Sequence, residues 1–161
     1  RSVATGSGIE GAIEGLEFPI IIEAFKDLDR TQTMILTDRQ SLYPFLRSIP
    51  FEYNLIMIQE LHQGTLVESL VIGESVHSMR RSWNAQRLEH SSKAQSTKMS
   101  SEDKETAIRA ARALGVEIAR VKMIGGVVIG VDPRVETDRF ENVLGADFGR
   151  HIVEYFEEKT R

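Results

Sequence analysis

The sequence has no cysteine, only one tryptophan, and no long hydrophobic stretch. The missing cysteine excludes disulfides, thiolate zinc sites and a cysteine nucleophile. No run approaches the roughly 20 apolar residues that a membrane-spanning helix requires, and no signal peptide is visible. We therefore expect no membrane partner, and a cytoplasmic location is the simplest expectation for a chain without disulfides.

An excess of positive charge is also missing. The 24 acidic and 20 basic residues give a net charge of -4 at pH 7, so the chain has no overall basic field that would hold nucleic acid. Hydrophobic residues make up 41% and charged residues 27%, which is ordinary globular usage. The chain begins at Arg1 and not at a methionine, which predicts a processed start or a fragment of a longer protein.

The distribution of hydrophobic residues predicts a single α/β domain over residues 9–158. A flexible lead-in at 1–8 precedes it, and a short tail at 159–161 follows. Within the domain, residues 84–101 are rich in serine and lysine and have few apolar residues. We expect this segment to be a mobile, basic loop.

Two apolar runs, 33–37 and 54–59, predict buried strands with a short helix over 41–49 between them. This order predicts a parallel βαβ core within a mixed sheet of four or five strands. Before it, helical spacing predicts helices over 9–17 and 19–28. A strand at 18–22 is the alternative for the second helix, because its isoleucines are β-branched.

The rest of the domain is predicted from periodicity. Residues 65–85 favour a helix. The alternative is a strand at 65–72 that returns antiparallel to 54–59 through His62-Gln-Gly64. Residues 101–114 favour a helix that ends at Gly115. The two runs that flank Gly125-Gly126 predict a β-hairpin. Apolar residues recur about every fourth position over 140–156 and predict a last helix, in which Gly145 and Gly149 either allow close packing or mark a break.

Three apolar strands end in carboxylates, and this is the clearest chemical pattern in the chain. The residues are Asp38, Glu60 and Asp132. Ligands of open α/β sheets bind beyond the carboxyl ends of the strands. Carboxylate oxygens there would suit Mg²⁺ or Mn²⁺. The other interpretation is that these acids only form turns and helix caps.

The segment Leu36-Thr-Asp-Arg-Gln-Ser-Leu42 and the segment Asn142-Val-Leu-Gly-Ala-Asp147 together resemble motifs of ribonuclease H-like nucleases. The resemblance implies an Mg²⁺- or Mn²⁺-dependent nuclease with Asp38, Glu17 and Asp147 as catalytic residues. It implies Asp38 and Glu14 as metal ligands. Glu14 and Glu17 are alternatives for the same position in the site. Asp132 and Glu60 are alternative metal ligands. The first strand of that family would have to lie upstream of Arg1.

Nucleic acid would then be the partner, and the basic segment would hold its phosphates. The candidate substrate-binding residues are Arg80, Arg81, Arg87 and Lys93. The alternative function is a non-catalytic oligomerisation or docking domain of a larger protein. In that case the helix at 140–156 would form the seam of a homo-oligomer.

Overall fold

The computed structural model describes residues 2–5, 15–26, 29–48 and 55–160. The chain divides into two compact units, Arg1–His62 and Gln63–Arg161. Each unit is built on its own antiparallel sheet. Over the described ranges, no helix combines the length and the apolar character needed to cross a membrane.

Unit 1 holds a sheet of four strands in the order β1-β4-β2-β3. Its core contains the side chains of Leu16, Ile20, Ile22, Leu36, Leu42 and Ile58. The helix α2 contributes Leu42 to that core. The elements of the unit are β1 (Ser2–Thr5), β2 (Ile20–Lys26), β3 (Asp29–Leu36), α2 (Leu42–Ser48) and β4 (Leu55–Glu60).

The predicted parallel βαβ core is wrong. The predicted order of strand, helix and strand exists as β3, α2 and β4, but β2 lies between the two strands and pairs antiparallel with both. The helix predicted over 19–28 is also wrong, because its isoleucines form β2, as the alternative at 18–22 anticipated. Residues 9–14 of the other predicted helix lie outside the described residues, and residues 15–17 are not helical.

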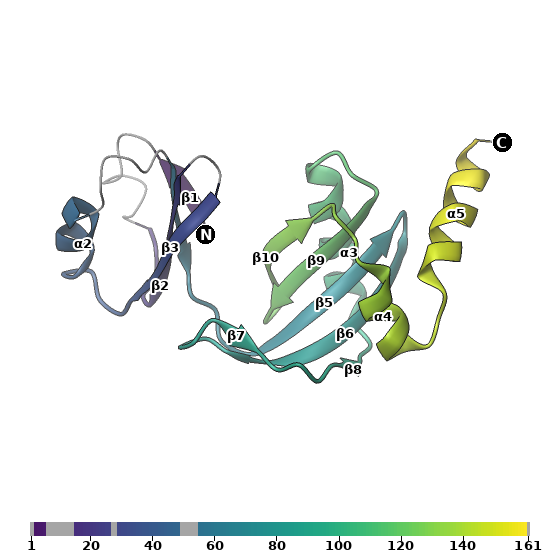
Figure 1. Ribbon diagram of the computed structural model, residues 1–161, viewed down its shortest axis with the longest axis horizontal. Helices are drawn as coiled ribbons and strands as arrows, with labels where there is room; N and C mark the ends of the chain where they lie inside the picture. Colours follow the sequence, from purple (N-terminus) through teal and green to yellow (C-terminus); the bar gives the residue numbers. More distant parts are fainter. Residues whose placement is uncertain (1, 6–14, 27–28, 49–54, 161) are drawn as a thin grey trace. The chain divides into compact units, whose positions relative to one another are not determined.

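Unit 2 holds a sheet in the order β10-β9-β5-β6-β7, with β8 also paired to β6 (Figure 1). Three helices accompany it. The elements are β5 (Thr65–Ile72), β6 (Ser75–Asn84), β7 (Glu89–His90), β8 (Gln95–Ser96), α3 (Ser101–Ala113), β9 (Ile118–Ile124), β10 (Val127–Asp132), α4 (Thr137–Leu144) and α5 (Phe148–Lys159).

Alternation along β5 places the two cores of unit 2 on opposite faces of the sheet. Val71 packs with Ala107 and Ala111 of α3. Its neighbours Leu70 and Ile72 belong to a second cluster, in which Phe140 of α4 and Phe148 of α5 are buried. The helices therefore cover part of each face, and the region around Glu68 keeps a polar character.

The helix predicted over 65–85 is wrong, because these residues form the hairpin of β5 and β6. The alternative strand at 65–72 exists as β5, but it pairs with β6 and β9, whereas β4 belongs to the other sheet. Leucines four residues apart suit one helix face, but they equally suit one face of a strand, where every second residue points the same way. Gly73 supplies the turn, and its φ of 57° is a left-handed conformation that glycine adopts without strain.

Other predictions for unit 2 are confirmed. The hairpin around Gly125-Gly126 is formed by β9 and β10. The helix predicted at 101–114 is α3, whose N-cap is Ser100. The last helix breaks at Gly145, where φ is 68°, into α4 and α5. The single mixed sheet is replaced by two antiparallel sheets, so a single α/β domain fits only in part.

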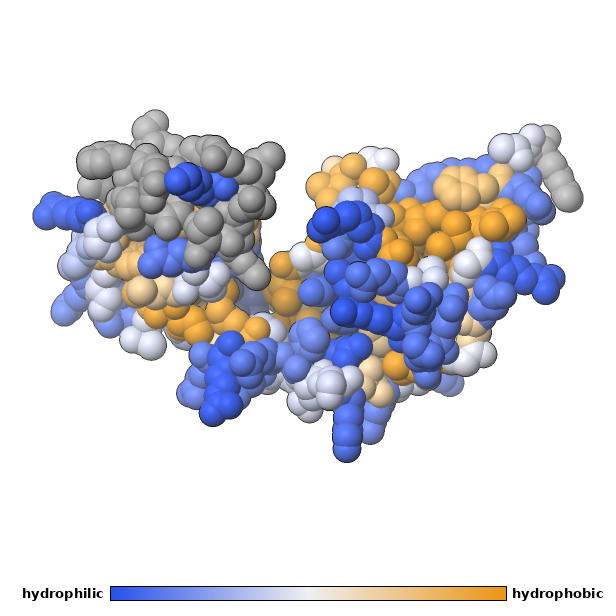
Figure 2. All heavy atoms as spheres, viewed as in Figure 1, coloured by the Kyte–Doolittle hydropathy of each residue, from blue (hydrophilic) through white to orange (hydrophobic). Residues whose placement is uncertain are grey.

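Helix α5 leaves part of its apolar face open. Val153 is 57% exposed and Phe156 is 52% exposed. Figure 2 shows hydrophobic residues gathered beside this helix. The homo-oligomer through residues 140–156 stays a prediction.

Candidate functional site

The polar region of the unit 2 sheet is centred on Glu68, in the middle of β5. Glu68 lies opposite Met79 on β6 and opposite Lys122 on β9, and Lys122 in turn lies opposite Gly130 on β10. Side chains that lie directly opposite one another in an antiparallel sheet share a face. Glu68 and Lys122 therefore stand side by side on the same face, which we call the Glu68 face.

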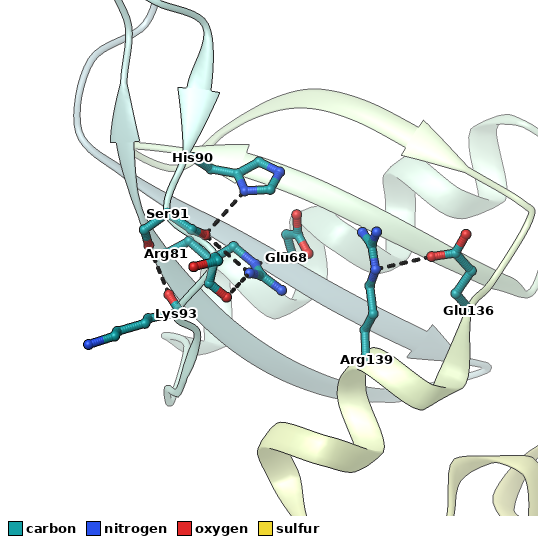
Figure 3. A network of polar contacts seen from close by, with 8 residues as sticks. Glu68, Arg81, His90, Ser91, Lys93, Glu136 and Arg139 are labelled. Atoms are coloured by element: carbon teal, nitrogen blue, oxygen red, sulfur yellow. Dashed lines mark hydrogen bonds and ion pairs between the residues drawn. The ribbon is translucent and has the colours of Figure 1, made fainter.

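The Glu68 carboxylate is fully buried, and its charged neighbour is Arg81 of β6. The Arg81 Nε atom lies 3.7 Å from the Glu68 Oε2 atom. Arg81 Nη1 donates to the carbonyl oxygens of Ser91 at 3.2 Å and Ser92 at 2.8 Å, which fix the guanidinium. Figure 3 shows Arg81 between Glu68 and the Ser91 segment. Neither oxygen of Glu68 has a hydrogen-bond partner among the described residues.

A second ion pair lies one row further along the sheet. Arg120 of β9 donates to Asp132 of β10 at 2.9 Å, and Arg134 adds its Nε at 3.3 Å and its backbone N–H at 2.9 Å. The hydrogen bond from the Arg134 backbone, followed by the side chains of Arg134 and Arg120, holds the pKa of Asp132 below its ordinary value. The ionised form of Asp132 is thus stabilised by ion pairs with two arginines.

At the start of α4, Arg139 pairs with Glu136 at 3.1 Å. Figure 3 shows Arg139 on the other side of Glu68 from the Ser91 segment. This region therefore contains five cationic side chains and three carboxylates, so it is locally positive although the whole chain carries a net charge of -4. The cations are Arg81, Arg120, Lys122, Arg134 and Arg139, and the carboxylates are Glu68, Asp132 and Glu136.

A cavity of about 480 Å³ adjoins this region, and we call it the basic cavity. Arg80 lies at its wall and donates to Gln95 Oε1 at 3.2 Å. Its lining has three cations and no carboxylate, so its chemistry suits an anion. Figure 3 shows Lys93 pointing away from Glu68. The lining residues are Thr65, Arg80, Arg81, Ser82, Ser91, Lys93 and Gln95.

Three of the four predicted substrate-binding residues therefore come together. Arg80, Arg81 and Lys93 line the basic cavity, whereas Arg87 lies in the turn between β6 and β7 and is not part of the lining. Their role in binding phosphate stays a prediction.

The predicted catalytic and metal-binding acids have local structural roles. Asp38 accepts from the Ser41 backbone N–H at 2.9 Å, and this bond lowers the pKa of its carboxyl group. Asp147 accepts from the Arg150 backbone N–H at 2.8 Å as the N-cap of α5. Glu60 accepts from the Glu17 backbone N–H at 3.2 Å.

These acids do not form one site within either unit. Asp38, Glu17 and Glu60 belong to unit 1, and Asp132 and Asp147 belong to unit 2. Glu14 lies outside the described residues. Across the described ranges, no group of three or more histidine, aspartate or glutamate side chains could hold a metal ion.

Sequence reasoning missed Glu68, Arg120 and Lys122. The sequence predicts a helix at Glu68, and a glutamate in an amphipathic helix is expected on the solvent-exposed face. The available signal was alternation: Leu66, Glu68 and Leu70 are every second residue and all three are buried. A charged residue within such a stripe marks a buried ion pair or a site.

The model of the RimK-like ATP-grasp domain matches residues 5–156 of the chain. The chain belongs to this ATP-grasp family. It is 24% identical over 165 aligned residues to a probable alpha-L-glutamate ligase of Picosynechococcus sp., covering 94% of this chain and 55% of the relative. It is 26% identical over 154 residues to a probable alpha-L-glutamate ligase of Chromohalobacter salexigens, covering 88% and 51%.

The fold of this ATP-grasp domain also resembles solved ligases. The ATP-grasp ligase PsnB, in complex with a phosphomimetic variant of a minimal precursor, Mg and ADP, superposes with a TM-score of 0.68. Identity is 17%, and the match covers 100% of this chain and 53% of that chain. The chain thus spans about half the length of the relatives it matches.

Membership of the ATP-grasp family overturns two predictions. The ribonuclease H-like resemblance is wrong, and with it the nuclease and hydrolase activity. In the Thr-Asp segment, Asp38 accepts from the Ser41 backbone N–H in the turn before α2, and Asp147 of the Asn–Ala-Asp segment is the N-cap of α5. The alternative of a non-catalytic docking domain has no support either, since the matched relatives are ligases. A nucleic-acid partner stays a prediction.

Proposed function

We propose that this ATP-grasp domain is part of an ATP-dependent ligase, and that unit 2 holds phosphate groups of the nucleotide. Support comes from the family match, from two relatives named as probable alpha-L-glutamate ligases, and from a similar fold solved with ADP. By the same comparison, the reaction would join an amino acid to an acceptor. An ATP-dependent reaction also fits the expected cytoplasmic location.

The gathering of cations in unit 2 is the observation that carries this proposal. Phosphate oxygens are bound best by guanidinium groups in fixed orientations. Arg81 is held by two carbonyl oxygens, and Arg80 by Gln95. Lys93 supplies a point charge at the same cavity. The lining of the basic cavity contains no carboxylate, and the Glu68 carboxylate that pairs with Arg81 is buried.

Mg²⁺ enters through the relatives. The PsnB complex contains Mg with ADP, which is consistent with the Mg²⁺ expected from the sequence at the level of the family. Those expected ligands that the structure describes do not converge within either unit, and a nucleotide can bring its own hydrated Mg²⁺ on its phosphates.

Calorimetric titration of ADP into the whole 161-residue chain tests the proposal. We expect binding, and we expect the double variant Arg80→Met/Lys93→Met to weaken it by about tenfold or more, because charge-assisted hydrogen bonds to phosphate are lost. Arg150→Met is the matched control, since Arg150 pairs with Glu154 on α5 and is not among the residues that line the basic cavity. Absence of ADP binding, or equal loss in the control, would contradict the proposal.

A further inference from the structure

We infer that this domain binds nucleotide phosphates through its own cationic side chains and does not need a divalent metal ion. The inference rests on the proposed function and concerns the Glu68 face of the unit 2 sheet. It starts from a disagreement: a relative is solved with Mg and ADP, but the described carboxylates of this chain do not fit a magnesium site.

Spacing on the sheet separates the two carboxylates of the Glu68 face. Glu68 and Asp132 stand two strands and one diagonal step apart, because Lys122 is opposite Glu68 and Arg120 is opposite Asp132. With ~4.8 Å between strands and ~3.3 Å per residue, their Cα atoms are roughly 12 Å apart. To bind one Mg²⁺, both side chains would have to extend toward each other until their oxygens lay within about 4 Å, since each bond is about 2.1 Å long. Glu68 is instead held beside Arg81, and Asp132 beside Arg120 and Arg134.

The carboxylates near this face already have partners. Asp132 is held by Arg120 and Arg134, and Glu136 by Arg139. Glu141 accepts from the backbone N–H groups of Phe148 and Gly149 at 3.0 and 3.2 Å. A metal ion would have to displace these bonds.

Lys122 occupies the place where a cation is needed. It lies between Glu68 on β5 and Gly130 on β10, in the middle of the row. Lys122 is partly exposed, and no described carboxylate lies within ion-pair distance of its ammonium group. A divalent ion at this position would be repelled by Lys122 and Arg120, whereas a phosphate would be attracted by both.

Glu68 acts here as a positioning residue. Its carboxylate is buried beneath the face and cannot reach a ligand directly. Its negative charge lies between Arg81 and Lys122 and keeps two cations close together that would otherwise repel each other. The fixed cations then do for the phosphates what a bound metal does elsewhere: they neutralise charge.

Titration of ADP into the whole chain, once in EDTA and once in excess Mg²⁺, tests the inference. We expect dissociation constants that agree within about threefold, and Lys122→Met should weaken binding in EDTA by about tenfold or more. Lys122→Arg should restore it, because the charge is kept. Arg150→Met serves again as the control, and thermal unfolding verifies that each variant is folded.

The outcomes separate the two proposals. Binding that requires Mg²⁺, or a Lys122→Met variant that binds as well as the parent in EDTA, would overturn the metal-free inference and leave the proposed function standing. Absence of binding in both buffers would overturn both. Lys122→Asp adds a gain-of-dependence readout: it removes the cation and adds a carboxylate, so ADP binding should be lost in EDTA and recovered in part with Mg²⁺.

Discussion

Glu68 on β5 lies directly opposite Lys122 on β9, so a buried carboxylate and a lysine share one face in the middle of the unit 2 sheet. Arg81 approaches the same carboxylate from β6. The hairpin strands β5 and β6 and the distant strand β9 thus contribute one charge each. The arrangement concentrates positive charge on a face of a chain that is acidic overall.

Arg81→Leu should destabilise the domain strongly. It would leave Glu68 buried without its ion-pair partner, and breaking such a pair costs about 3–5 kcal/mol. The double variant Glu68→Leu/Arg81→Leu should recover most of this loss, because no uncompensated charge remains. Urea unfolding of the two variants measures the difference. Arg134→Leu is the control, since that side chain is 91% exposed; a loss as large as that of Arg81→Leu would refute the argument.

Gly73→Ala should destabilise the β5–β6 hairpin for two reasons. Gly73 has a φ of 57°, which costs a side chain about 1 kcal/mol or more. In addition, a Cβ atom at Gly73 would overlap the ring of Tyr155 on α5. Thermal unfolding should therefore show a larger loss for Gly73→Ala than for Gly115→Ala, the matched control. Gly115 has a φ of 71°, and its Cβ would meet nothing within 4 Å.

A second variant isolates the clash at Gly73. In the background Tyr155→Ala the ring is absent, so Gly73→Ala should cost only what Gly115→Ala costs. If the cost of Gly73→Ala is the same with and without Tyr155, the overlap contributes nothing.

His77 should make the stability of unit 2 depend on pH. Burial lowers the pKa of His77, and His151 and Lys104 lower it further. An unfolded histidine has a pKa of about 6.5. Below that pH the unfolded chain binds a proton that the folded chain refuses, so the free energy of unfolding falls as the pH drops. The fall stops below the folded pKa of His77.

Urea unfolding between pH 8 and pH 5 measures this effect, a range set by the histidine pKa of about 6.5. His77→Gln should flatten the curve, whereas His90→Gln, at an exposed position, should leave it unchanged. Asp38 and Asp132, whose pKa values are lowered, lose their contributions only in more acidic solution. A slope that persists in His77→Gln would assign the effect to another group.

The sequence predicted those elements whose signals are local. The Gly125-Gly126 turn and the helical spacing that ends at Gly115 act over a few residues, so the hairpin and the helix were identified. The β5–β6 hairpin was missed because leucines four residues apart satisfy both periods. The parallel core was inferred from chain order, but β2 takes the central place through pairing with β4, which no local signal reveals.

The same limit applies to the site. Arg80, Arg81 and Lys93 were recognisable from composition, because they are close in sequence and of one charge. Lys122 joins Glu68 only through the register of β5 and β9. That register depends on the packing of two faces against α3, α4 and α5. A single sequence does not specify such a distant pairing.

The pairing of β5 with β9 has a kinetic consequence. The hairpins β5–β6 and β9–β10 each close over a turn of adjacent residues, at Gly73 and at Gly125-Gly126, and such hairpins form in about 1–10 μs. Joining them requires the whole segment 73–117 to be closed as a loop, which costs more entropy and more time. We therefore expect the pairing of β5 with β9, which joins the two hairpins, to limit the rate at which unit 2 folds.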